Sequence, residues 1–190
     1  MSRTLVFGGA RSGKSALAER LAQASGKEVI YLATAAAAAH AGDAEMARRI
    51  AHHQERRPPH WQTVEEATAL AATLRHLCAP GRIVLVDCLT LWLSNLMFST
   101  HADYPDVGPI DLPPLFAAER AALLDWLDAP AAGEVVFVSN EVGMGIVPYG
   151  AVSRAFTDEA GRLNQDVAAR CERVLLVAAG LPLALKGPAC

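Results

Sequence analysis

The sequence predicts an α/β fold in which a mostly parallel β-sheet carries helices on both faces. Three observations support this prediction. Hydrophobic residues make up 52% of the 190-residue chain and charged residues only 19%, as expected of a chain that folds around a buried core. Short apolar runs alternate with longer helical patterns, which favours parallel strands joined by right-handed crossovers. Most of these runs are continuously apolar, which is typical of strands that helices cover on both faces.

The apolar runs that we expect to form strands are short. They are Thr4–Phe7, Glu28–Ala33, Arg82–Val86, Glu134–Ser139, Arg173–Ala178 and a short last strand at Leu183–Lys186. The segments with helical patterns are Lys14–Ala24, Ala44–Arg56, Glu65–Leu77, Leu89–Phe98, Leu115–Leu127 and Val152–Arg170. A Pro-rich segment, Asp103–Pro114, is predicted to be a surface loop. Because neither flank of this loop would complete a sheet alone, we expect residues 1–190 to form a single domain.

Charge and cysteine content restrict the partners and the compartment. The formal net charge is −3 and no long basic run occurs, which argues against nucleic acid and favours a small-molecule partner. The four cysteines have no C-x-x-C spacing, so we expect reduced thiols in a cytoplasmic protein. No segment reaches the roughly 18 apolar residues of a membrane span, and the first apolar run is too short for a signal peptide.

The strongest local pattern is a glycine-rich loop that matches G-x-x-x-x-G-K-[ST]. It comprises Gly8, Gly9, Ala10, Arg11, Ser12, Gly13, Lys14 and Ser15, between the first predicted strand and the first predicted helix. Glycines let the backbone wrap around anionic oxygens, and the start of the helix adds the positive end of its dipole. In such a loop Lys14 reaches the β- and γ-phosphates and the Ser15 hydroxyl binds Mg²⁺. The pattern predicts a nucleoside-triphosphate site on a P-loop NTPase-like (RecA-like) sheet.

Acidic residues follow two of the predicted strands. Asp87 comes directly after the strand Arg82–Val86, where P-loop proteins carry a carboxylate for Mg²⁺. The alternative is a helix cap, since a helical pattern begins at Leu89. Glu141 follows the strand Glu134–Ser139, and it could help to hold Mg²⁺ through water, orient an attacking hydroxyl, or cap a tight turn.

Three of the six histidines lie in one short stretch, and one of them is predicted to face inward. On a helix, Met46, Ile50 and His53 fall at i, i+4 and i+7 and share one face. His52 lies about 100° away from that face, as 3.6 residues per turn dictate. An imidazole near arginines in a triphosphate-binding protein can clamp a phosphate or attack phosphorus. The plain alternative is a polar surface helix whose histidines have no chemical role.

Five blocks of residues occur along nearly the whole chain. They are Gly8-Gly-Ala-Arg-Ser-Gly-Lys-Ser15, Glu45-Met-Ala-x-Arg-Ile-x-x-His53-x-x-x-Arg57-Pro58-x-x-Trp61-x-Thr63-Val-Glu65, Val86-Asp87-Cys-Leu-Thr, Ser139-Asn140-Glu141-Val142-Gly143-Met-Gly-Ile-Val-Pro148, and Phe156-x-Asp158-x-x-Gly161-x-x-Asn164-Gln165. In this order they resemble the bifunctional adenosylcobinamide kinase/adenosylcobinamide-phosphate guanylyltransferase family. The second and fourth blocks are the specific ones, because a P-loop occurs in many families.

The resemblance implies two reactions in the biosynthesis of adenosylcobalamin. The first phosphorylates adenosylcobinamide with ATP or GTP. The second transfers GMP from GTP, through a guanylylated histidine, to adenosylcobinamide phosphate and gives adenosylcobinamide-GDP. The resemblance assigns the histidine to His53 and also implies a homotrimer, whereas Mg²⁺ is expected as cofactor from the P-loop and Asp87. It puts the nucleotide contacts on the P-loop and on Thr34, Gln54, Glu55, Arg56, Arg57, Glu65 and Asp87.

Two other functions remain open at the level of sequence. One is a P-loop small-molecule kinase in which His53 only clamps a phosphate. The other is a RecA-like ATP-binding module that acts on DNA or on a protein partner. The acidic charge balance and the lack of a basic stripe disfavour the second.

Overall fold

The computed structural model of this chain describes residues 2–35, 57–100, 103–130 and 132–188. The predicted helix Ala44–Arg56 lies outside the described residues. The same is true of five predicted site and alternative residues, which are His52, His53, Gln54, Glu55 and Arg56.

The described residues form a seven-stranded sheet with the strand order β3-β2-β4-β5-β1-β6-β7. Its strands are β1 (Arg3–Gly8), β2 (Glu28–Ala33), β3 (Gln62–Glu65), β4 (Arg82–Asp87), β5 (Glu134–Asn140), β6 (Arg173–Ala178) and β7 (Leu181–Lys186). All neighbouring strands are parallel except β7, which runs antiparallel to β6 at the edge. The prediction of a mostly parallel α/β sheet is confirmed.

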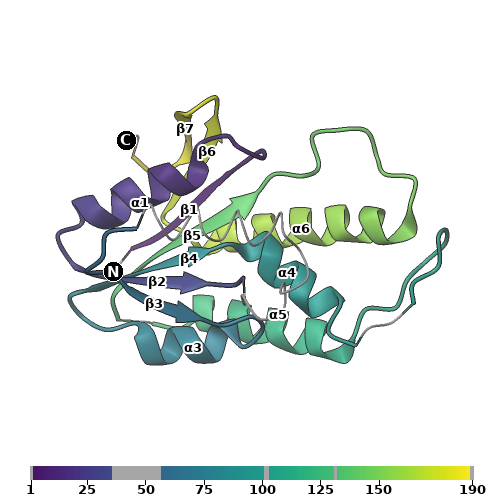
Figure 1. The fold of residues 1–190 in the computed structure, drawn as a ribbon, viewed down its shortest axis with the longest axis horizontal. Helices are drawn as coiled ribbons and strands as arrows, with labels where there is room; N and C mark the ends of the chain where they lie inside the picture. Colours follow the sequence, from purple (N-terminus) through teal and green to yellow (C-terminus); the bar gives the residue numbers. More distant parts are fainter. Residues whose placement is uncertain (1, 36–56, 101–102, 131, 189–190) are drawn as a thin grey trace.

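Helices cover both faces of this sheet (Figure 1). The described helices are α1 (Lys14–Ala24), α3 (Leu70–Leu77), α4 (Leu89–Met97), α5 (Pro114–Asp128) and α6 (Ala151–Arg170). On one face, Leu17 and Ala18 of α1 belong to a core with Val6 and Leu85. On the other face, α3, α4, α5 and α6 enclose a larger core, and this part of the prediction is also confirmed. None of the helices in the described residues is long and apolar enough to cross a membrane.

The continuous apolar runs in the sequence follow from this two-sided burial. In β4, Val84 and Val86 belong to the larger core, whereas Ile83 and Leu85 belong to the core beneath α1. Successive residues of a strand point to opposite faces, so a strand buried on both faces needs apolar residues at every position.

The prediction of a helix from Glu65 was wrong. Gln62–Glu65 forms the edge strand β3, which pairs in parallel with β2, and the helix α3 begins only at Leu70. The backbone amides of Thr68 and Ala69 both donate to the Glu66 carboxylate at 2.8 Å. This carboxylate stabilises a turn before the helix. The strand was missed because β3 is short and exposed, and its four residues lack a continuous apolar run.

The register of the parallel strands brings their carboxyl ends to one edge of the sheet. Glu65 pairs with Ala33, Ala33 pairs with Asp87, and Gly8 pairs with Asn140. Ligands of open α/β sheets bind outside this edge, so the fold places the predicted acidic residues and the glycine-rich loop on the same side of the molecule.

Candidate active site

The glycine-rich loop connects β1 directly to α1, as the sequence predicted. Gly8 ends the strand and Lys14 begins the helix. The turn between them is held by the Ser12 amide, which donates to the Gly9 carbonyl at 3.2 Å. The first amides of α1 have no partner within a helix and point toward the loop. They offer a phosphate N–H donors together with the positive end of the helix dipole.

Two glycines of this loop are required by close approach of the backbone. A Cβ on Gly8 would lie 2.3 Å from the Val177 carbonyl oxygen. Gly13 has φ +97°, and a Cβ there would lie 3.1 Å from Cα of Gly180. The Gly180 amide also donates to the Ser12 carbonyl at 2.8 Å. The turn between β6 and β7 therefore packs against the loop and stabilises it.

Lys14 is buried beneath the loop, with 9% of its surface exposed. Its ammonium group donates to the Gly9 carbonyl at 3.2 Å. Burial lowers the pKa of Lys14 from its ordinary value, and the nearby Asp87 acts in the opposite direction. A buried cation at the start of α1 is therefore available to bind phosphate oxygens.

Asp87 is the last residue of β4 and lies close enough to Lys14 to affect its titration. The Asp87 carboxylate and the Ser15 hydroxyl are both hard oxygen donors, which fits Mg²⁺. In the described part of the chain, no group of three or more histidine, cysteine or acidic side chains could hold a metal. Mg²⁺ is usually held by one or two protein ligands together with substrate phosphates and water, and Ser15 and Asp87 could supply two such ligands.

Tyr31 contacts both Asp87 and Arg57. It was not among the site residues predicted from the sequence. Its hydroxyl donates to Oδ2 of Asp87 at 2.7 Å. The central guanidinium carbon of Arg57 lies 3.5 Å from the centre of the Tyr31 ring. Burial raises the pKa of Tyr31, so the phenol stays protonated and remains a donor. The strand β2 appeared in the sequence only as an apolar run, in which a tyrosine is unremarkable.

Thr34 follows β2 and forms hydrogen bonds with the backbone of Cys88, directly after β4. It is completely buried, and its hydroxyl donates to the Cys88 carbonyl and accepts from the Cys88 amide, both at 2.9 Å. Asn95 of α4 donates to the Thr34 carbonyl at 2.8 Å. The hydroxyl hydrogen of Thr34 is therefore already used within the protein. Its contact with a nucleotide remains a prediction.

The end of β5 is held by a second set of polar contacts. Asn140 donates to the Thr90 hydroxyl at 2.7 Å, and Asn164 of α6 donates to the Asn140 carbonyl at 3.1 Å. The Glu141 amide donates to the Gly8 carbonyl at 3.0 Å, which joins this strand end to the P-loop. The Glu141 carboxylate accepts from the Gly143 amide at 2.6 Å. Of the three roles considered for Glu141, the structure shows the capping of a turn.

A family model described as cobinamide kinase/cobinamide phosphate guanyltransferase matches residues 4–185. The chain belongs to this family. It is 54% identical over 185 residues to the bifunctional adenosylcobalamin biosynthesis protein CobP of Pseudomonas aeruginosa, covering 97% of this chain and 98% of that protein. It is 41% identical to the bifunctional adenosylcobalamin biosynthesis protein CobU of Escherichia coli, covering 96% of this chain and 98% of that protein.

Solved structures support the P-loop fold without bearing on function. An ATPase from the type III secretion system of pathogenic bacteria superposes with a TM-score of 0.56 at 15% identity. The match covers 96% of this chain and 56% of that ATPase. The assembled secretion ATPase EscN of enteropathogenic E. coli gives a TM-score of 0.50 at 14% identity, over 94% of this chain and 43% of EscN.

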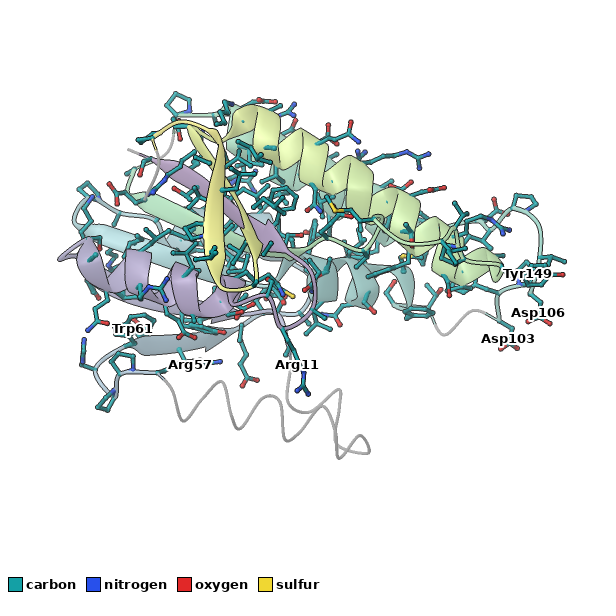
Figure 2. The ribbon with its side chains drawn as sticks, turned by 90° about the horizontal axis from the view of Figure 1, so that it is seen from above. Arg11, Arg57, Trp61, Asp103, Asp106 and Tyr149 are labelled. Carbon is teal, nitrogen blue, oxygen red and sulfur yellow. The ribbon has the colours of Figure 1, made fainter. Side chains whose placement is uncertain are left out.

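In this cobinamide kinase/guanyltransferase family member, the described site residues gather at one edge of the sheet. Thr34 and Asp87 lie at the ends of the neighbouring strands β2 and β4, and the P-loop follows β1, which β5 separates from β4. Glu65 is exposed at the end of the edge strand β3. Arg11 is exposed and has φ +56°, and Figure 2 shows its side chain extending outward. Arg57 stacks on Tyr31, and its contact with a nucleotide remains a prediction.

Proposed function

We propose that this chain catalyses both reactions of its family. It phosphorylates adenosylcobinamide with ATP or GTP, and it transfers GMP from GTP through His53 to adenosylcobinamide phosphate, giving adenosylcobinamide-GDP. The observation that carries the proposal is the strand–P-loop–helix unit with a buried Lys14 beside Asp87, in a chain that the family model matches over residues 4–185. We also propose that the enzyme acts in the cytoplasm, as the spacing of its cysteines leads us to expect.

In the kinase reaction, the chain's own groups bind and orient the triphosphate. The loop amides and Lys14 hold the β- and γ-phosphates, and Ser15 and Asp87 would hold Mg²⁺. Bound Mg²⁺ neutralises charge that develops on the phosphate oxygens. The hydroxyl of adenosylcobinamide attacks the γ-phosphorus, an O–P bond forms, and the bond to the β–γ bridging oxygen breaks. The hydroxyl proton is released, and a nucleoside diphosphate leaves.

In the guanylyltransferase reaction, His53 supplies a nitrogen nucleophile. An N–P bond to the α-phosphorus forms, the α–β bridging bond breaks, and pyrophosphate leaves with its charge stabilised by Lys14 and the loop amides. A phosphate oxygen of adenosylcobinamide phosphate then attacks the same phosphorus, and the N–P bond breaks. His53 is thereby regenerated and adenosylcobinamide-GDP is released.

Isotope labelling tests this function. The protein is incubated with GTP labelled either in the α-phosphate or in the γ-phosphate, with and without adenosylcobinamide. Without adenosylcobinamide, we expect label from the α-phosphate to remain covalently on the protein. With adenosylcobinamide, we expect label from the γ-phosphate to appear on it and label from the α-phosphate to pass into adenosylcobinamide-GDP. Transfer of γ-label without any covalent α-label would reduce the function to that of a plain kinase.

The substitution Asp87→Asn is expected to act as a lesion of the metal site. The amide keeps the shape of the side chain but removes the charge, so the Mg²⁺ concentration at half-maximal kinase rate should rise roughly tenfold or more. High Mg²⁺ should restore part of the lost rate. Asp128→Asn is a matched control, because Asp128 forms an exposed ion pair with Arg170 on α6. An Mg²⁺ dependence of Asp87→Asn equal to that of the wild type would contradict this role.

We also propose that the chain forms a homotrimer, and the edge strand β7 supports a subunit contact. Leu181, Leu183 and Leu185 alternate along β7 and are 73%, 58% and 54% exposed, whereas Ala184 between them packs toward the core beneath α1. Light scattering should give three times the chain mass for the wild type and a smaller mass for Leu183→Glu. Leu115→Glu, at the exposed start of α5, is the control. A monomeric wild type, or a trimer that survives Leu183→Glu, would remove this support.

A further inference from the structure

We propose that Tyr31 is a positioning residue for the magnesium carboxylate Asp87, and that Arg57 strengthens this positioning by stacking over the Tyr31 ring. The inference rests on the proposed function in one respect, which is the assignment of Asp87 to the metal. Neither the family match nor the nucleotide motifs assign a role to Tyr31.

The contact between Tyr31 and Asp87 crosses between neighbouring strands at their carboxyl ends. β2 and β4 are paired in parallel, with Tyr31 opposite Leu85 and Ala33 opposite Asp87. From this position the Tyr31 hydroxyl reaches Oδ2 of Asp87 at 2.7 Å. The hydrogen bond from the Tyr31 hydroxyl fixes the position of one oxygen of the Asp87 carboxylate. Because the carboxylate is planar, this also fixes the direction of its other oxygen. A carboxylate that binds Mg²⁺ benefits from such support, because Mg²⁺ demands near-ideal octahedral geometry.

The environment of Tyr31 makes this hydrogen bond strong. The side chain is only 2% exposed, so water competes little for the hydroxyl. A hydrogen bond from a neutral donor to a carboxylate is charge-assisted, and it is stronger than one between neutral groups. Fixed by the hydrophobic core around β2, the ring cannot move away without leaving a polar group of the site unpaired.

Arg57 lies over the face of the Tyr31 ring. Its guanidinium carbon is 3.5 Å from the ring centre, which is within the range of a cation–π contact. A cation above the ring withdraws electron density from the phenol and makes its O–H a better donor to Asp87. Arg57 also directly follows the predicted histidine helix in the sequence. The contact between Arg57 and Tyr31 therefore connects the end of the predicted histidine helix to Asp87, the proposed metal carboxylate.

Nucleotide binding measured against Mg²⁺ concentration tests the proposal without relying on turnover. A fluorescent GTP analogue is titrated onto the protein at a series of Mg²⁺ concentrations, including none. For Tyr31→Phe we expect the half-saturating Mg²⁺ concentration to rise about tenfold, as loss of one charge-assisted hydrogen bond implies, while the affinity without Mg²⁺ is unchanged. Tyr104→Phe is the matched control, because the Tyr104 hydroxyl donates to the Met97 carbonyl away from the site.

A double-mutant cycle tests the role of Arg57. We expect Arg57→Gln to raise the half-saturating Mg²⁺ concentration about threefold in the wild-type background and not at all in the Tyr31→Phe background. Arg57 is only half-buried, so Arg57→Gln in the wild-type background still tests the stack if Tyr31→Phe does not fold, and no shift in that background would overturn it. An effect of Arg57→Gln that is equal in both backgrounds would overturn the role of the stack.

Two outcomes would overturn the role of Tyr31. One is an Mg²⁺ dependence of Tyr31→Phe that matches the wild type. The other is an equal loss of affinity with and without Mg²⁺, which indicates a general disturbance of the fold. Asp87→Asn, measured in the same assay, separates this inference from the proposed function. If Asp87→Asn shifts the Mg²⁺ dependence and Tyr31→Phe does not, only the positioning role fails, whereas no shift in Asp87→Asn removes the metal assignment itself.

Discussion

Lys14→Ala is expected to abolish productive use of nucleoside triphosphates in both reactions. Lys14 is buried beneath the P-loop, where its ammonium group lies 3.2 Å from the Gly9 carbonyl. In the proposed mechanism, Lys14 stabilises the transferred phosphoryl group of the kinase reaction and the departing pyrophosphate of the guanylyl reaction. Removal of one electrostatic clamp from a transition state costs on the order of 3 kcal/mol, or at least a hundredfold in rate. Initial rates with labelled ATP and GTP measure both losses.

The control for this experiment is the other lysine near the start of the chain. Lys27→Ala removes a surface ion pair with Glu134, in which the two charged groups are 2.8 Å apart. Such pairs contribute about 0–1 kcal/mol to stability and no binding to substrate, so both rates should stay near those of the wild type. If Lys14→Ala retained one of the two rates, the two reactions would not share the P-loop.

Much of the fold could be predicted because the burial of a strand is reflected in its amino-acid sequence. Strands covered on both faces require unbroken apolar runs, and β1, β2, β4, β5 and β6 all show one. The edge strand β3 was missed for the same physical reason. It is largely exposed, so its hydrogen bonds to β2 leave no apolar pattern in the four residues that form it.

The part of the candidate site that was easiest to predict is the P-loop, because its function depends on residues that are neighbours along the chain. A P-loop is contiguous, and Gly8 and Gly13 are needed at fixed positions because the backbone there passes within contact distance of Val177 and Gly180. Tyr31 and Asn95, which were not predicted from the sequence, act through contacts between distant segments. A tyrosine hydroxyl 56 positions away from its carboxylate partner has no local signature, and its role appears only when β2 and β4 lie side by side.

His53→Ala is expected to remove all covalent labelling from α-labelled GTP while leaving some phosphorylation of adenosylcobinamide. Near pH 7 much of an unperturbed imidazole is uncharged, and this neutral form is the nucleophile. The phosphoryl group of the kinase reaction goes directly to the substrate hydroxyl, so that reaction does not need the histidine. The measurements are retention of label on the denatured protein and formation of labelled adenosylcobinamide phosphate from γ-labelled GTP.

His52→Ala is the matched control, because the two histidines are adjacent and differ only in the helix face that they occupy. In the predicted helix, His53 continues the stripe of Met46 and Ile50, whereas His52 is rotated by about 100°. We therefore expect His52→Ala to keep its label. The adduct should also be lost in acid and persist in alkali, since protonation of the imidazole makes it a good leaving group. Label that survives His53→Ala and disappears with His52→Ala would assign the reaction to the other ring, and an acid-stable adduct would exclude a phosphorus–nitrogen bond altogether.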